Sequence, residues 1–286
     1  MRLIHLTDLH LTRPPGWRSY RGRSQSGKRY LGYLSWWRRR RHSLRAVWYE
    51  ELLDVVGHLA ADQILVSGDL TQTGTAEEID AALPWIQRLG TPEQVLVVPG
   101  NHDVYAAESM ARVQARWGDY LHLTDSGYPL VRDSAGVRVV GLCSARPTQP
   151  FSATGRLGER QCERLDALLA QPADAVRVVL LHHPPVPGLV GARKRLQDAD
   201  VLADILARRG VELVLHGHQH RNREVVVGAT RILCTGPASS VDASFRVFDI
   251  ESDQGNPRVS AELWQRVGAG DFRRMDTGIW TFSAPG

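Results

Sequence analysis

Five short polar clusters in the sequence contain residue types that bind metal ions. Each cluster contains an aspartate, an asparagine or a histidine, and none contains cysteine. Each also follows directly after an apolar run of the length expected for a buried strand. In chain order the clusters are Asp8-Leu9-His10, Gly68-Asp69, Gly100-Asn101-His102-Asp103, His182-His183-Pro184 and Gly217-His218-Gln219-His220. Most of the 11 histidines lie in or beside them, which a random distribution would not produce.

Carboxylates, imidazoles and a carboxamide suit divalent metals of intermediate hardness, such as Mn, Fe, Zn or Co. The candidate ligands are Asp8, His10, Asp69, Asn101, His182, His218 and His220. They are too many for one tetrahedral ion, but they match a dinuclear centre with one bridging carboxylate. Two metals about 3.5–4 Å apart can clamp the attacking and leaving oxygens of a phosphoryl displacement.

Each cluster alone also has an ordinary structural explanation. Gly68-Asp69 can form a turn before a helix, Gly100–Asp103 can form a β-turn, and His182-His183 can lead into a rigid proline loop. Only the combination, after five separate strands, favours a metal site. The sequence has no GxxxxGK[ST] motif and therefore does not predict a nucleotide-binding P-loop.

Four histidines outside this set are interpreted as structural. His5, His58 and His122 lie away from the clusters. His216 directly precedes the last cluster, but the alternation of a strand is expected to turn its side chain away.

Apolar runs that alternate with helical patterns must position these clusters. The predicted strands are Leu3–Thr7, Gln63–Ser67, Gln94–Val98, Val137–Leu142, Val176–Leu181 and Val211–Leu215. One helix is predicted over Ser43–Ala60, where apolar residues recur at three- and four-residue steps. Another is predicted to begin at Thr75, because Thr75 and Glu78 have capping-box spacing.

After His220 the pattern changes to strands with alternating character. These are Arg223–Gly228, Arg231–Thr235, Phe245–Ile250 and Arg258–Gln265. The sequence therefore predicts an α/β fold with a mixed sheet or a sandwich flanked by helices, rather than a purely parallel sheet. We expect one domain over residues 1–286, since no repeat or linker interrupts the pattern.

The ordered set D-x-H, G-D, G-N-H-D, H-x-P and G-H-x-H resembles that of the calcineurin-like metallophosphoesterases. It extends from Asp8 to His220 and is highly specific as a set. The resemblance implies two mixed β-sheets packed as a sandwich, with a dinuclear metal centre at one edge. It also implies a metal-dependent hydrolase of phosphoesters.

The same resemblance implies a role for each candidate residue. One metal ion would be held by Asp8, His10, Asp69 and His220, and the other by Asp69, Asn101, His182 and His218. His182 is preferred to His183 because it stands two residues before Pro184. His102 resembles the family's non-ligand histidine, a general acid oriented by Asp103. The implied reaction is attack on phosphorus by a metal-bound hydroxide, with His102 protonating the leaving oxygen.

The net charge of +4 arises from one segment. Arg13–Arg45 contains no Asp or Glu, whereas the rest of the chain has more acidic than basic residues. The three cysteines form no C-x-x-C pair, which fits a reducing compartment. No apolar stretch is long enough to cross a bilayer, so we expect a cytoplasmic protein.

The segment at about 13–45 is predicted to be a basic, aromatic insertion beside the metal centre. A helix from about Lys28 would place Tyr30, Tyr33, Leu34, Trp37, Arg41 and Leu44 on one face. Such a helix can simply pack on the domain. It can also bind an anionic membrane surface peripherally, whereas nucleic-acid binding is less favoured. The membrane contact would use Trp36, Trp37, Arg38, Arg39, Arg40 and Arg41.

Four functions fit these observations. The H-H-P-P and G-N-H-D forms resemble the bacterial branch that includes class III cyclic nucleotide phosphodiesterases, and they favour a phosphodiesterase. The insertion raises a lipid-linked diphosphate pyrophosphatase of the UDP-diacylglucosamine type as an alternative. A nuclease and a non-catalytic metal-site binding protein are further alternatives.

Overall fold

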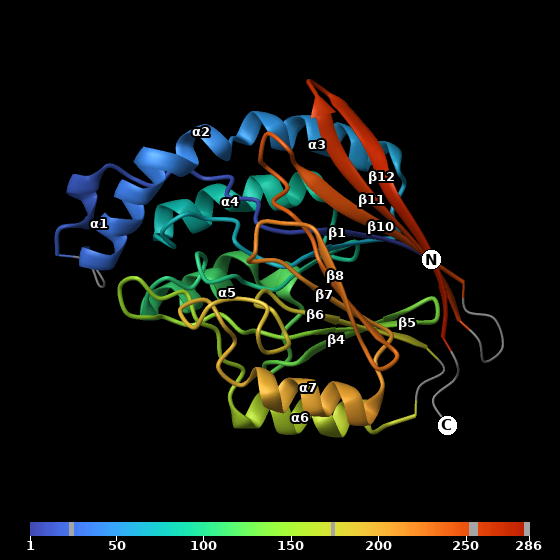
Figure 1. Ribbon diagram of the computed structural model, residues 1–286. Helices are drawn as coiled ribbons and strands as arrows, with labels where there is room; N and C mark the ends of the chain where they lie inside the picture. The colour runs from blue at the N-terminus through green and yellow to red at the C-terminus, as the bar shows by residue number, and fades with distance from the viewer. Residues whose placement is uncertain (23–25, 173–174, 252–256, 283–286) are drawn as a thin grey trace.

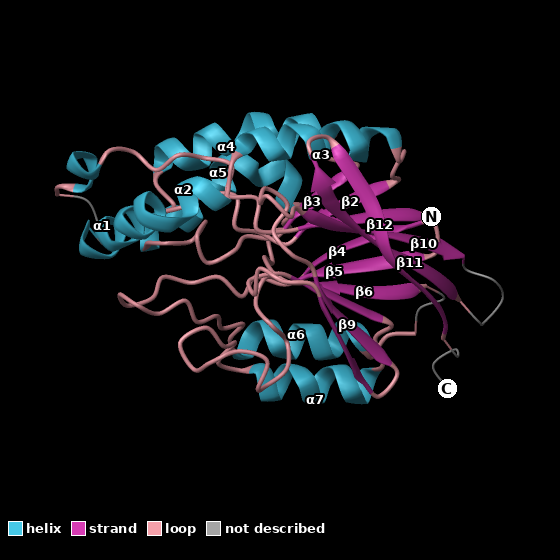
Figure 2. Cartoon of the chain, turned by 45° about the horizontal axis from the view of Figure 1, so that its top comes forward, coloured by secondary structure: helices cyan, strands magenta, loops and turns pink. Residues whose placement is uncertain are grey.

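A computed structural model of the protein describes residues 1–22, 26–172, 175–251 and 257–282. Its strands form two six-stranded sheets that face each other, and helices cover the two outer faces (Figures 1 and 2). Both sheets contain parallel and antiparallel pairs. The prediction of two mixed sheets packed as a sandwich flanked by helices is therefore confirmed.

The first sheet combines the N-terminal strands with the last strands of the chain. In spatial order it contains β12 (Asp271–Thr281), β11 (Arg258–Gly268), β10 (Ser244–Glu251), β1 (Arg2–Leu6), β2 (Gln63–Val66) and β3 (Val95–Val97). The strands β1, β2 and β3 run parallel, whereas β10, β11 and β12 are joined by antiparallel pairs.

The second sheet is built from the middle of the chain. In spatial order it contains β4 (Leu130–Ser134), β5 (Val137–Gly141), β6 (Val176–Leu180), β7 (Leu213–His216), β9 (Thr230–Cys234) and β8 (Arg223–Val227). Its four central strands are parallel, and β4 and β8 are antiparallel edge strands.

The interface between the sheets is an apolar layer that includes Leu65, Phe248, Val178 and Leu215. The strands β2, β6 and β7 are buried along their whole length. This burial on both faces explains why their sequences are continuously apolar rather than alternating.

Helices on the outer faces complete the core. The first sheet is covered by α3 (Ala46–His58), α4 (Ala76–Leu89) and α5 (Ala107–Leu121), and the second by α6 (Glu159–Leu169) and α7 (Ala199–Arg209) (Figure 2). No helix in the described part of the chain combines the length and apolarity needed to cross a membrane.

The insertion folds into short helical pieces that project from one side of the molecule (Figure 1). They are the 3₁₀ turn η1 (Trp17–Tyr20), α1 (Ser26–Ser35), the π-helical turn η2 (Trp36–Arg40) and the short α2 (Arg41–Ser43). Its attachment to the domain includes the buried Arg29, which donates hydrogen bonds to the carbonyls of Thr73 and Gly74 at 3.3 and 3.1 Å. The insertion is thus joined to the loop after β2.

The residues predicted to share one helix face of the insertion do not share one environment, since Leu44 is buried and Tyr30 is exposed. The side chain of Trp37 is 46% exposed, and Arg41 is also exposed. From Trp36 onward η2 changes the face, because a π-helical turn contains more residues than an α-helical turn and shifts every following side chain. Tyr30, which precedes η2 in α1, is exposed as well.

The other element predictions hold with small shifts at the ends. Every predicted strand is present, but α3 begins at Ala46 rather than Ser43, because Leu44 is extended and bridges to Ser240. The strands β4 and β12 were not predicted. In β12 the apolar residues Met275 and Ile279 are exposed, so its sequence lacks the pattern of a half-buried strand.

The carboxylate of Glu78 fixes the loop after β2. The predicted capping box is present, with the Thr75 hydroxyl accepting the Glu78 N–H at 3.3 Å. The buried Glu78 carboxylate accepts hydrogen bonds from the backbone N–H groups of Gln72 (2.8 Å) and Thr73 (3.1 Å). It also accepts one from the Thr12 hydroxyl at 3.2 Å. Glu78 therefore ties the loops of the first two polar clusters together.

Replacing Glu78 should destabilise the protein. In Glu78→Ala at least two buried N–H groups lose their acceptor, so we expect the free energy of unfolding to fall by about 3 kcal/mol. Urea denaturation of the variant and of Glu163→Ala, an exposed position on α6, makes the comparison. Equal stabilities of the two variants would contradict the role given to Glu78.

Candidate metal centre

All five polar clusters lie at one end of the two sheets. Three follow the parallel strands β1, β2 and β3, and two follow β6 and β7. Because the carboxyl ends of parallel strands meet at one edge, their loops converge there. Figure 2 shows these loops gathered between the sheets and the helices of the insertion.

The backbone of these loops is strained at the candidate ligands. Positive φ angles occur at Asp8 (51°), His10 (44°), Asp69 (57°), His218 (70°) and His220 (53°). These are five of the nine non-glycine residues with positive φ in the described chain. Such a conformation costs an ordinary residue about 1 kcal/mol or more. Its concentration at one edge indicates that the loops are shaped to aim these side chains.

The first group of side chains consists of Asp8, His10, Asp69 and His220. One ligand atom from each lies within 4.8 Å of those of the others. His220 Nε2 is 3.2 Å from Asp8 Oδ1 and 3.4 Å from His10 Nε2. Four donor atoms of this kind at one point form a set suited to one divalent cation.

A second group lies on the other side of Asp69. It is centred on His182, whose Nε2 is 3.1 Å from Asn101 Oδ1 and 3.2 Å from His218 Nδ1. The same nitrogen is 3.4 Å from Asp69 Oδ2. Because that oxygen is also 4.0 Å from His10 Nε2, Asp69 lies between the two groups.

Hydrogen bonds fix the tautomers of two central histidines. His10 Nδ1 donates to the carbonyl of Thr71 at 2.9 Å, and His182 Nδ1 donates to the carbonyl of Ser67 at 2.7 Å. Each ring, when neutral, therefore presents an Nε2 lone pair to its ligand group. Backbone carbonyls commonly hold metal-binding imidazoles in this way.

The two groups fit cations because their lone pairs face one another. Asp8 Oδ1 and His218 Nε2 are buried and have no hydrogen-bond partner among the described residues. Buried acceptors without a donor cost free energy, and acceptors about 3.2 Å apart repel each other. Positive charge between them removes both penalties. The side chains present therefore fit a dinuclear centre.

The electrostatics of Asp69 and His182 favour opposite charges. Burial acts to raise the pKa of Asp69, but His182 and other imidazoles lower it well below its usual value. Burial acts to lower the pKa of His182, but the carboxylate of Asp69 raises it to about 9. A cation bound between them would take the place of the His182 proton.

His102 lies beside the bridging carboxylate. Its backbone N–H donates to Asp69 Oδ1 at 2.7 Å, and its ring Nδ1 donates to the carbonyl of Gln72 at 2.6 Å. Burial lowers the pKa of the ring well below its usual value, so the free side chain is neutral at pH 7. The contact that the structure gives Nε2 is with Arg40 Nη1, at 3.3 Å.

Asp103 does not orient the His102 ring, contrary to the sequence prediction. Its carboxylate instead accepts the N–H groups of Gly100, Asp69, Leu70 and Thr71, at 2.8–2.9 Å. The orienting acceptor is the Gln72 carbonyl. The physical reason is that Asp103 is fully occupied in joining the loops after β2 and β3.

The remaining histidines have protein partners. Both nitrogens of the buried His183 are engaged, with Ser144 Oγ at 2.8 Å and the carbonyl of Ala153 at 3.2 Å. His5 is buried between two hydroxyl groups, and His122 bonds to a backbone carbonyl. The His58 side chain caps its own helix at the surface, and His216 bonds to the carbonyl of Gly217.

Two residues near the centre were not predicted. Gln72 acts through its carbonyl group, which leaves no signal in the sequence. Arg40 extends from the insertion and has a guanidinium nitrogen 3.3 Å from the His102 ring. The four consecutive arginines drew attention to this segment of the sequence, but they did not indicate which of them contacts His102.

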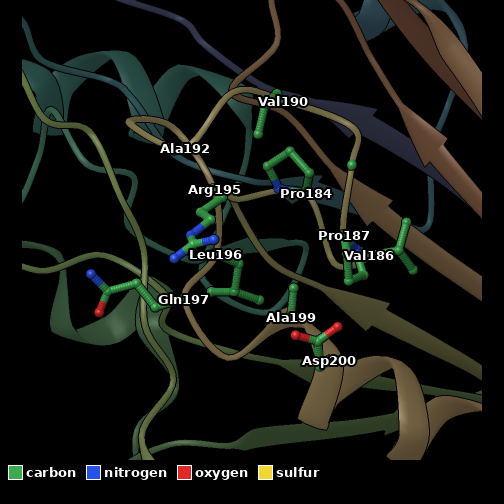
Figure 3. A pocket seen from close by; sticks show the side chains of 11 residues that line it. Pro184, Val186, Pro187, Val190, Ala192, Arg195, Leu196, Gln197, Ala199 and Asp200 are labelled. Carbon is green, nitrogen blue, oxygen red and sulfur yellow. The ribbon is translucent and has the colours of Figure 1, made fainter.

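A separate small pocket of about 170 Å³ lies behind the fourth cluster. Pro184, Arg195, Leu196 and Asp200 are among the side chains that line it (Figure 3). Its lining includes none of the candidate metal ligands, as far as the structure describes the chain. The pocket therefore does not belong to the metal centre.

This fold and its Asp/His cluster define a metal-dependent phosphoester hydrolase. Residues 1–222 match the family model described as calcineurin-like phosphoesterase, and the chain belongs to that family. The resemblance drawn from the five motifs is thereby confirmed.

The curated relatives are named as diesterases. A probable cyclic nucleotide phosphodiesterase from Synechococcus sp. is 30% identical over 67% of this chain and 73% of its own. Another, from Rhodococcus erythropolis, is 31% identical over 56% of this chain and 51% of its own length. A probable glycerophosphodiester phosphodiesterase from Arcobacter nitrofigilis is 29% identical over 56% and 57%. The match thus spans only about half of the latter two relatives.

Solved structures share the fold. A dimetal phosphatase from Danio rerio superposes with a TM-score of 0.66 at 14% identity, over 99% of both chains. The purple acid phosphatase PPD1 from yellow lupin gives a TM-score of 0.60 at 13% identity, over 99% of this chain and 53% of its own. At these identities the likeness shows the fold alone.

The two adjacent histidines should differ in metal binding. We expect His182→Ala to lose one of two bound metal ions, because its Nε2 lies in the second group. His183→Ala should keep both ions, since both of its ring nitrogens bond to the protein. Metal content of purified, Mn-loaded protein measures this. Loss of metal from His183→Ala alone would reverse the assignment.

Proposed function

We propose that the protein is a dinuclear metal-dependent phosphodiesterase. The supporting observation is the position of Asp69, one oxygen of which faces both groups of candidate ligands. One ion would be held by Asp8, His10, Asp69 and His220, and the other by Asp69, Asn101, His182 and His218. The donor set suits Mn, Fe, Zn or Co.

The chain's own residues would orient the phosphate and move the proton. Two bound cations would supply Lewis-acid activation of water and neutralise charge on the phosphoryl oxygens. His102 would bind a phosphoryl oxygen with its ring held by Gln72. An anionic phosphate raises the pKa of a neighbouring imidazole, which allows Nε2 to carry the proton given to the leaving oxygen. Asp103 would act indirectly, by positioning the loops of Asp69 and His102.

The names of the relatives support a diester as the substrate. Two are named as probable cyclic nucleotide phosphodiesterases and one as a probable glycerophosphodiester phosphodiesterase. A panel of cyclic AMP, a glycerophosphodiester, a lipid-linked diphosphate and single-stranded DNA separates this proposal from the alternatives. Absence of turnover on every member, with two metals bound, would favour a non-catalytic binding protein.

The role of His102 predicts a leaving-group effect. His102→Ala should lower kcat for a glycerophosphodiester by about 100- to 10,000-fold, because the alkoxide must be protonated as it leaves. The loss should be smaller for bis(p-nitrophenyl) phosphate, because p-nitrophenolate leaves without a proton. Asp69→Ala should abolish both activities. Equal losses of the two activities in His102→Ala would contradict general acid catalysis.

We further propose a cytoplasmic protein whose insertion binds an anionic membrane surface. Trp17 and Trp37 are 42% and 46% exposed, and arginines stack on both rings. An interfacial tryptophan beside exposed arginines is typical of peripheral membrane contacts. Arg40 differs from the other members of this group, because its guanidinium contacts His102.

Liposome co-sedimentation tests the membrane proposal. Changing the exposed Arg38, Arg39 and Arg41 to Ser should weaken binding to anionic vesicles about 100-fold, at roughly 1 kcal/mol per arginine. A control with Arg160, Arg258 and Arg273 changed to Ser removes the same charge elsewhere and should bind normally. Equal binding by the two triple variants would reject the insertion as the contact.

A further inference from the structure

Arg40 is the one arginine of the run Arg38–Arg41 that turns toward the metal centre. Arg38, Arg39 and Arg41 are exposed, whereas Arg40 is partly buried. Arg40 is the last residue of the π-helical turn η2. Such turns frequently occur at functional sites, because they re-aim a side chain that a regular helix would point elsewhere.

The guanidinium of Arg40 lies over the ring of His102. Its Nη1 is 3.3 Å from both ring nitrogens. An approach in the plane of the ring at equal distances would collide with Cε1, so the contact is with the face of the ring. The backbone N–H of His102 in turn donates to Asp69, the carboxylate between the two ligand groups. His102 therefore connects Arg40 to Asp69, the candidate bridging ligand.

The insertion holds Arg40 in this position through several buried contacts. Arg40 Nη2 donates to the carbonyl of Gly32 at 3.1 Å. A Cβ atom at Gly32 would lie only 2.5 Å from the hydroxyl of Tyr105, so glycine lets α1 approach this closely. Lys28, also on α1, donates to Thr148 Oγ1 at 3.0 Å and lies over the Tyr105 ring. These contacts anchor α1 against Tyr105 and Thr148.

The charge of Arg40 is incompletely matched by the protein. Among the described residues, the guanidinium contacts the face of the His102 ring and donates a hydrogen bond to the Gly32 carbonyl. Its Nε is buried without a hydrogen-bond partner in the part of the chain that the structure describes. A partly buried cation without an anionic partner is unfavourable, and cations bound nearby would repel it further. An anionic ligand at this position would remove both penalties.

We propose that Arg40 binds the phosphate of the substrate and makes the insertion part of the substrate site. The inference rests on the proposed function for the nature of the substrate. The phosphate would lie between the dinuclear centre and Arg40, within reach of His102. Planar guanidinium groups pair well with phosphate oxygens, which suits this role. The other three arginines of the run remain on the outer surface.

Phosphate binding tests this role without turnover. Isothermal titration of inorganic phosphate into Mn-loaded protein would compare wild type with Arg40→Met, Arg40→Lys and Arg39→Met. We expect Arg40→Met to weaken phosphate binding by about 10- to 100-fold, the usual effect of losing a charged hydrogen bond. Arg40→Lys should restore part of the affinity, and the exposed Arg39→Met should match wild type. Metal content should be the same in all four proteins.

The outcomes separate this inference from the proposed function. If Arg40→Met and Arg40→Lys bind phosphate as tightly as wild type, Arg40 is not a phosphate ligand, even where diester turnover persists. If both variants lose bound metal, the residue is structural and the inference is likewise overturned. If phosphate binding depends on Arg40 but no phosphoester is hydrolysed, the inference holds and the proposed function fails.

Discussion

The rest of the site depends on the hydrogen bonds that the Asp103 carboxylate accepts from two loops. The carboxylate accepts backbone N–H groups from the loop after β2 and from the loop after β3. These bonds set the left-handed conformation of Asp69, and Asp69 in turn accepts the N–H of His102. A single buried acceptor thereby fixes the spacing of two clusters, Gly68-Asp69 and Gly100–Asp103. Loops without these hydrogen bonds could not hold the buried carboxylates of Asp8 and Asp69 so close to the histidines of the site.

The strain in the loops and the mutual repulsion of the ligands have one explanation. Both are unfavourable for the folded chain alone. Cations at the edge of the sheets would remove the repulsion, and their binding would offset the cost of the strain. The rigid two-sheet core supplies the free energy that keeps the site assembled. The insertion adds a further unmatched charge, Arg40, on the face of His102. Bound metal ions would neutralise the carboxylate ligands, and a bound phosphate would neutralise Arg40.

Much of the fold and of the candidate site could be predicted from the sequence. Strand ends are visible as apolar runs that stop at Asp8, Asp69 or His218, and parallel strands bring their carboxyl ends together. Partners that depend on backbone atoms could not be predicted, such as the Gln72 carbonyl that holds His102. The four arginines in a row are chemically alike. The π-helical turn η2 decides that Arg40 is the one directed toward His102. No pattern in the sequence predicted a π-helical turn at this position.

The central claim is that Asp69 bridges two metal ions at this edge. A crystal structure of the Mn-loaded protein, with anomalous scattering recorded at the Mn absorption edge, tests it most directly. We predict two anomalous peaks about 3.5–4 Å apart on either side of Asp69. One peak should contact His10 and His220, and the other His182 and His218. A single peak, or a second peak away from Asp69, would contradict the account.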